Sequence, residues 1–249
     1  MCLILFCISP DSEHRLVIAA NRDERYARPT ARPTFWEDAP EVLAGRDLQA
    51  GGTWLGISRR GRFAAVTNFR EAPIEPVPPL SRGALAADFL RSTESCVDYI
   101  DRIKPQADQY RGFNLLIDDG QDTYYYSNRS ADIQRLAPGY YGLSNQLLDG
   151  NWPKVNRGRA DLRGIADTGF STQALLNLLA DRGDDKPFSA RFIASDSYGT
   201  SASTVVKIKH DQHMTFEERA FLAHGESATS ASFEVTAEKR SPWRVGKNP

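Results

Sequence analysis

The sequence is poor in cysteine, in net charge and in long apolar runs, and each shortage excludes a class of protein. Three cysteines in 249 residues are too few, and odd in number, for a disulfide framework, so we expect a cytoplasmic protein. The formal net charge of -1, without long charged runs, gives no electrostatic basis for binding nucleic acid. The apolar start, residues 1–8, is too short for a membrane span and lacks the basic residues of a signal peptide.

Motifs for common cofactors and metals are also missing. The sequence contains no phosphate-binding loop, dinucleotide fingerprint, CxxC pair or serine nucleophile elbow. His210 and His213 are three residues apart, but "KHDQH" is typical of a turn between two strands. We therefore predict no metal site and no required cofactor.

What is present is a regular order of strands, helices, strands, helices and strands. Residues 2–8 and 15–21 are apolar on both faces around "SPDSEH", which predicts a central hairpin covered on both sides. A second hairpin is predicted over 51–57 and 62–69. Apolar spacing predicts helices at 83–92, 94–103, 153–165 and 172–181, and strands at 113–118, 122–128, 139–145, 190–195, 203–209 and 214–223.

This order favours stacked layers over alternating βαβ units, because strands run together and helices come in pairs. A hairpin that is apolar on both faces needs cover above and below. We expect one domain over residues 1–249 with an α+β fold, a four-layer αββα sandwich of two sheets between two helical layers. The one compositionally biased stretch is Ser/Ala-rich and lies near residues 226–233.

A cysteine directly follows the initiator methionine. Aminopeptidases remove Met1 when the next side chain is small, and the product would carry a thiol and a free α-amine on Cys2. Such a residue is a complete nucleophile–base unit, because the amine can take the proton of the thiol. The alternative is that Cys2 is a small hydrophobic residue that starts a buried strand.

Polar residues leave the second strand at "NRDE", residues 21–24, beside the expected position of Cys2. Burial of four polar side chains is costly unless they are paired or functional. Strand alternation puts Asn21 and Asp23 on one face and Arg22 and Glu24 on the other, so one face can point at the cysteine. The alternative is that the strand reaches solvent here.

Two asparagines and two glycines stand at similar places. Asn68 and Asn145 each end a predicted strand, and an asparagine amide can donate a hydrogen bond to a developing oxyanion. Each can equally be an ordinary turn residue. Gly51 and Gly52 allow a close backbone approach or a positive φ.

Together these segments resemble a known family. "MC", "AANRDE", "GGTWLG", "TNFRE", "SRG", "FNLL", "GLSN", "WPK" and "YGT" occur in this order and resemble the NRDE family, which includes transport and Golgi organization protein 2 and bacterial relatives. That family is similar in turn to the N-terminal nucleophile (Ntn) hydrolases of the choloylglycine and penicillin acylase type. Those hydrolases have an αββα sandwich, in agreement with the expected layers.

The resemblance implies a catalytic site and a reaction. It implies Cys2 as the nucleophile, Arg22 and Asp23 as the charged pair after the second strand, and Asn68 and Asn145 as ligands of the amine and the oxyanion. It also places four further residues as ligand contacts: Asn21, Glu24, Trp54 and Tyr198. The expected reaction is cleavage of a non-peptide C–N amide bond in a small molecule through a thioester.

The chain departs from its relatives at two points. The hydrolases separate the arginine and the aspartate, whereas Arg22 and Asp23 are adjacent and so point to opposite faces. Relatives commonly have arginine after "YGT", where this chain has Ser201. The alternative function, which also rests on the resemblance, is non-catalytic binding and trafficking of haem or another amphipathic ligand on the same scaffold, with haem as cargo.

Overall fold

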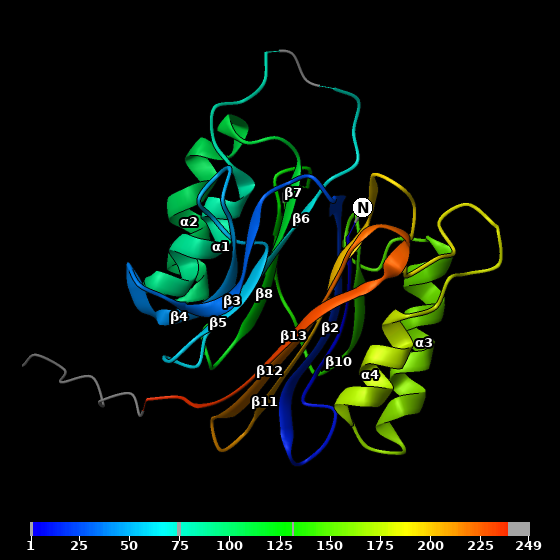
Figure 1. Cartoon of the computed structure of the whole chain (residues 1–249). Coiled ribbons are helices and arrows are strands. Elements are labelled where there is room, and N and C mark those ends of the chain that lie inside the picture. The colour runs from blue at the N-terminus through cyan, green and yellow to red at the C-terminus, as the bar shows by residue number, and fades with distance from the viewer. Residues whose placement is uncertain (1, 74–75, 131, 239–249) are drawn as a thin grey trace, which may run out of the picture.

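Two antiparallel sheets lie face to face between two pairs of helices (Figure 1). The computed structural model describes residues 2–73, 76–130 and 132–238. Removal or retention of Met1 lies outside the described residues. The layers confirm the predicted αββα sandwich.

The first sheet contains the two predicted N-terminal strands at its centre. Its six strands have the order β10-β1-β2-β11-β12-β13. Their bounds are β10 Gly139–Leu143, β1 Leu3–Ile8, β2 His14–Arg25, β11 Tyr198–Lys209, β12 His213–Phe221 and β13 Ser227–Thr236. His210 and His213 flank the turn between β11 and β12, as expected from "KHDQH".

The second sheet has seven strands in sequence order, β3 to β9, so each strand pairs with the strand before it. Their bounds are β3 Thr30–Trp36, β4 Ala39–Asp47, β5 Leu55–Ser58, β6 Phe63–Asn68, β7 Phe113–Asp118, β8 Thr123–Ser127 and β9 Ile133–Arg135. The predicted hairpin around residues 58–62 is the β5–β6 pair.

Each sheet is covered on its outer face by a pair of helices (Figure 1). The seven-stranded sheet carries α1 (Arg82–Arg91) and α2 (Cys96–Ile103), and the six-stranded sheet carries α3 (Pro153–Ala166) and α4 (Thr172–Leu179). The hydroxyl of Ser95 caps α2 and that of Ser171 caps α4, and Pro153 begins α3, where its missing N–H costs nothing. Within the described ranges, no helix is both long and apolar enough to cross a membrane.

Strand β1 shows why the sequence was apolar on both faces. Ile4, Phe6 and Ile8 pack between the two sheets, whereas Leu3, Leu5 and Cys7 pack under α3 and α4. All of these side chains are buried. Because period-2 alternation sends neighbours to opposite faces, a strand between two apolar layers must be apolar throughout.

One predicted strand is wrong. Residues 190–195 form no strand, although Arg191 and Phe192 are buried. The backbone N–H groups of Arg191 and Phe192 both donate to the carbonyl of Asp181, and the N–H of Ile193 donates to the hydroxyl of Thr200. The segment therefore packs as a loop beside α4, with its hydrogen bonds used outside any ladder.

Four strands that the sequence did not predict complete the sheets: β3, β4, β9 and β13. Strand β3 contains Pro33 and lies at a sheet edge, where a missing N–H is tolerated. Strand β13 is the Ser/Ala-rich stretch, and it pairs with β12 alone. Strands β3, β9 and β13 lie at sheet edges, where one exposed side weakens the apolar signal, whereas β4 is an interior strand.

Gly52 brings a loop of the second sheet against the start of α1. A Cβ at Gly52 would lie 2.3 Å from the carbonyl carbon of Gly83. Gly51 has φ +78, in the left-handed region that favours glycine. Of the two properties that these glycines allow, Gly52 therefore has the close approach and Gly51 the positive φ. Arg82, which precedes Gly83, lines a cavity beside Cys2.

We expect Gly52→Ala to lower the free energy of unfolding by about 1–3 kcal/mol, since two backbone segments must separate. Urea denaturation followed by circular dichroism measures this loss. The matched control is Gly164→Ala in α3, where an added Cβ meets nothing within 4 Å. The control should stabilise the protein by ~0.5–1 kcal/mol. Equal effects of the two variants would contradict the close-approach argument.

Candidate functional site

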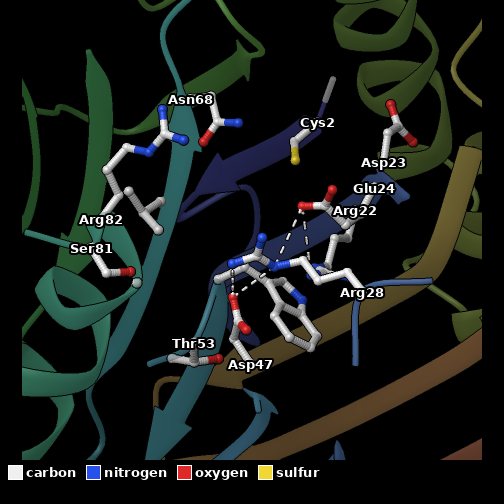
Figure 2. Close-up of a pocket in the computed structure, with 13 residues that line it drawn as sticks. Cys2, Arg22, Asp23, Glu24, Arg28, Asp47, Thr53, Asn68, Ser81 and Arg82 are labelled. Atoms are coloured by element: carbon white, nitrogen blue, oxygen red, sulfur yellow. Dashed lines mark hydrogen bonds and ion pairs between the residues drawn. The ribbon is translucent and has the colours of Figure 1, made fainter. Parts of the chain in front are cut away.

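A polar cavity of about 130 Å³ opens beside Cys2, at the end of the sandwich where β1 begins and β2 ends (Figure 2). Charged side chains dominate its wall. It is lined by Cys2, Arg22, Asp23, Glu24, Arg28, Asp47, Thr53, Trp54, Val66, Asn68, Ser81, Arg82 and Gly83. Cys2 precedes β1 and is half-buried, and its side chain lines this hydrophilic space.

Backbone contacts hold Cys2 at this end of the sheet. Leu3 pairs with Asn21 of β2, which places Cys2 next to Arg22. The hydroxyl of Ser144 donates a hydrogen bond of 2.5 Å to the carbonyl of Cys2. Cys2 is half-buried, so a small molecule can reach its side chain.

Arg22 and Asp23 both line the cavity, although they lie on opposite faces of β2, and a β-bulge of the neighbouring strand lies beside them. Asp23 pairs with Thr200 and Arg22 pairs with Ala202, so Ser201 is the extra residue of β11. The Ser201 hydroxyl donates to the Arg22 carbonyl (3.1 Å) and accepts from Nη1 of Arg22 (3.0 Å). Ser201 therefore holds Arg22 in place.

Arg22 belongs to a chain of alternating charges along one wall (Figure 2). Its guanidinium lies 4.2 Å from the centre of the Trp54 ring and 3.8 Å from the Glu24 carboxylate. Glu24 is 3.9 Å from Arg28, which binds Asp47 at 2.6 Å. Burial lowers the pKa of Arg22, and the negative charge of Glu24 opposes that shift.

Asp23 lies on the other side of Cys2, toward the helices. Its Oδ1 accepts a hydrogen bond of 2.8 Å from the Thr200 hydroxyl. Burial raises the pKa of Asp23 to about 6, and the charge of Lys154 opposes the rise. Lys154, the second residue of α3, is 1% exposed, and its Nζ makes no hydrogen bond within the described part of the chain. Its buried ammonium thus acts on Asp23 through charge.

The two asparagines have different places. Asn68 ends β6, is exposed, and lies on the wall facing Cys2 next to Arg82 (Figure 2). Asn145 follows β10, is buried, and donates from Nδ2 to the carbonyl of Asn68 at 2.8 Å. Asn68 therefore presents its amide to the cavity, whereas Asn145 positions the backbone of Asn68 and lines a neighbouring cavity.

The four residues expected to contact a ligand divide into two pairs. Glu24 and Trp54 line the cavity. Asn21 donates to the carbonyls of Leu179 (3.0 Å) and Arg191 (2.8 Å), so its amide anchors the end of α4 and the loop after it. The Tyr198 hydroxyl donates to the carbonyl of Asp23 at 3.2 Å. Asn21 and Tyr198 thus lie beside the site and position its residues.

Several residues of the site escaped the sequence analysis. Arg82 and Lys154 lie inside "SRG" and "WPK", but no chemistry was assigned to either segment. Ser144 lies inside "GLSN" without an assigned role, and Arg28 and Asp47 lie outside the quoted motifs. The missing signal is the same in each case, because these side chains approach Cys2 only through tertiary packing.

The chain matches a family model described as "Transport and Golgi organisation 2" over residues 1–223. The transport and Golgi organization protein 2 homologue of Bos taurus is 36% identical, and the match covers 89% of this chain and 94% of the relative. The homologue of Homo sapiens is 33% identical, with 92% and 98% covered. That of Drosophila melanogaster is 26% identical, with 91% and 95% covered.

Solved structures show the same fold at low identity. One is a Caenorhabditis elegans orthologue of N-acylethanolamine-hydrolyzing acid amidase, with a TM-score of 0.54, 10% identity, and 82% of this chain and 92% of that chain covered. Another is the mutant C2A of conjugated bile acid hydrolase from Clostridium perfringens, with a TM-score of 0.53, 9% identity, and 96% and 94% covered. The predicted Ntn hydrolase fold is therefore confirmed.

Cys2 should be the one thiol that reacts with iodoacetamide in the folded protein. Cys7 and Cys96 are buried. Burial raises the pKa of Cys7 to about 12 and also raises the pKa of Cys96 far above its usual range. Intact mass and peptide mapping should show a single adduct on Cys2 in buffer and three adducts in guanidinium chloride. Equal labelling of Cys7 or Cys96 in buffer would contradict the site.

Glu218 of β12 makes stability depend on pH. It is buried near Arg22, and its Oε2 accepts from the Thr204 hydroxyl at 2.8 Å. Burial raises its pKa from 4.5 to about 7. The folded state therefore keeps a proton that the unfolded state releases, and stability falls as pH rises between these values.

We expect Glu218→Gln to remove this loss, because the amide keeps the hydrogen bond and never ionises. Relative to the wild type, the variant should gain ~2–3 kcal/mol between pH 4.5 and pH 8. Urea denaturation of both proteins at the two pH values measures the gain, and titrations common to both cancel. A difference that does not change with pH would show that Glu218 ionises without penalty.

Proposed function

This chain belongs to the Transport and Golgi organisation 2 family, and we propose that it is a cysteine hydrolase that cleaves a non-peptide C–N amide bond with Cys2 as the nucleophile. The observation that carries the proposal is the convergence of Cys2, Arg22, Asp23 and Asn68 on one cavity. The similarity in fold to an acid amidase and a bile acid hydrolase supports the reaction class.

In this mechanism the chain supplies the nucleophile and its base. After removal of Met1, the α-amine of Cys2 takes the thiol proton, and the sulfur attacks the amide carbonyl. The C–N bond breaks as the amine returns the proton to the leaving nitrogen, which yields a thioester and a free amine. Water then attacks the thioester, with the α-amine as base, and releases the acid and the thiol.

The surrounding residues hold charge at defined positions. The Asn68 amide, which faces Cys2, donates to the oxyanion of each tetrahedral intermediate, a contribution of up to about 3–4 kcal/mol. Arg22 favours the thiolate. Asp23 orients the α-amine when ionised, and Lys154 promotes that ionisation. Protonation of Asp23 should accordingly lower the activity at acidic pH, since burial raises the pKa of Asp23.

No specific observation favours the alternative of haem trafficking. The cavity at Cys2 is walled by charged side chains, and among the described residues that line it there is no histidine. An axial ligand for haem would thus have to be Cys2 itself. Haem binding stays a prediction from the family resemblance.

Cys2→Ala should abolish amidase activity, by about 10³-fold or more, while the fold is retained, since the half-buried thiol makes no core contact. The measurement is release of primary amine from a panel of N-acyl amides, with intact mass to establish that Met1 is absent. The matched control is Cys96→Ala, which removes a buried thiol of α2 and should keep the wild-type rate. Wild-type turnover by Cys2→Ala would end the hydrolase proposal.

A further inference from the structure

A second cavity, of about 310 Å³, adjoins the cavity at Cys2. Asn68 and Arg82 line both cavities, so the two share a wall. The remaining lining residues come from the segment after β6, from one position shortly before β7 and from one after β10: Phe69, Arg70, Glu71, Ala72, Pro73, Arg111 and Asn145. A molecule that reaches past Asn68 can therefore place one group in each cavity.

The second cavity is rich in guanidinium groups. Arg70, Arg82 and Arg111 line it together. Arg82 is fixed by a hydrogen bond of 3.1 Å from its Nη1 to the carbonyl of Gly112. Burial lowers the pKa of Arg82, and the charge of Arg111 lowers it further, which shows that the two cations lie close together. Nε of Arg111 is buried and has no hydrogen-bond partner among the described residues.

The one carboxylate in the lining is already engaged. Glu71 accepts two hydrogen bonds from Arg129, at Nε (2.7 Å) and Nη2 (3.0 Å), and one from the backbone N–H of Gly112 (2.8 Å). Arg129 does not line the cavity and supplies a counter-charge to Glu71 from outside. The cavity therefore carries an excess of positive charge toward anything that enters it.

Building on the proposed function, we infer that the second cavity binds an acidic group of the substrate, so that the preferred substrates are amides that also carry a carboxylate or phosphate. Guanidinium groups bind both anions through paired N–H donors. With the acidic group held by Arg111 and its neighbours, the amide carbonyl can lie between Asn68 and Cys2. The Arg-rich cavity thus selects the substrate, and the Cys2 cavity carries the chemistry.

Alkylation of Cys2 tests whether the positive charge of the second cavity attracts anions, and it does not require turnover of a substrate. Iodoacetate is an anion and iodoacetamide is neutral, and the ratio of their rate constants cancels the reactivity of the thiol itself. We expect the ratio to be higher for Cys2 than for free cysteine and to fall about 3- to 10-fold in Arg111→Gln. Arg111→Lys should retain most of the ratio. Arg70→Gln, which changes the same wall from another segment, should lower it as well.

The matched control is Arg135→Gln. Arg135 is an exposed residue of β9 that forms an ion pair with Asp122 and lines a different cavity. This variant should keep the wild-type ratio. Inorganic phosphate at ~10 mM should slow iodoacetate more than iodoacetamide in the wild type, and should lose this selectivity in Arg111→Gln. N-acetylglycine is tested in the same way, as a competitor that carries a carboxylate. If phosphate and N-acetylglycine both slow the reaction with iodoacetate, the cavity binds either anion. If only N-acetylglycine slows it, the cavity binds carboxylates.

The outcomes separate the two proposals. Equal ratios in the wild type, Arg111→Gln and Arg70→Gln would overturn the anion cavity, whatever Cys2 does to amides. A ratio that depends on Arg111, in a protein that cleaves no amide, would keep the anion cavity and overturn the hydrolase. Circular dichroism of each variant establishes that the ratio is measured on folded protein.

Discussion

The hydrogen bonds of Ser144 join the two sheets at the end where Cys2 lies, and the site depends on this link. The Ser144 hydroxyl donates to the carbonyl of Cys2, and its own carbonyl accepts from the hydroxyl of Thr67 on β6. Asn114 of β7 donates to Thr67 and to the Ser144 carbonyl, so the link is buried and doubly held. Because such bonds are strong where water is absent, the start of β1 and the end of β6 stay in fixed register. Cys2 and Asn68, which lie on different sheets, can therefore act on one molecule.

The charged side chains near Cys2 are arranged so that most of the buried ones have a neighbour of opposite charge. Glu24 lies between Arg22 and Arg28, and Asp47 follows Arg28 in the same wall. On the other side of Cys2, the cation of Lys154 and the carboxylate of Asp23 offset part of each other's burial. Burial of single charges is costly, so residues held in this way point to a use beyond stability. The positive cavity past Asn68 extends the same arrangement toward a substrate anion.

Most of the fold could be predicted because its central strands and its helices carry strong periodic signals. Strand β1 is apolar on both faces since it lies between two apolar layers, and the hairpins follow from the turns beside them. The strand predictions failed where the apolar pattern of a segment did not match the hydrogen bonds of its backbone. Residues 190–195 have the apolar pattern of a strand, but their backbone N–H groups donate to Asp181 and Thr200. Strand β13 has the composition of a polar tail, but it pairs with β12 at the edge of a sheet. An apolar pattern reports burial, not the partner of a backbone N–H.

The sequence by itself determined that Cys2 and "NRDE" lie together, because a short hairpin pairs neighbouring strands and its register follows from alternation. It also determined that Asn68 ends a strand. Only the tertiary structure decided that Arg22 and Asp23 share a cavity, since its other walls come from β4, β6 and the start of α1. It alone brought Arg82, Arg111 and Lys154 to the site. Those contacts join segments far apart in the chain, and no local pattern encodes the distance between two packed layers.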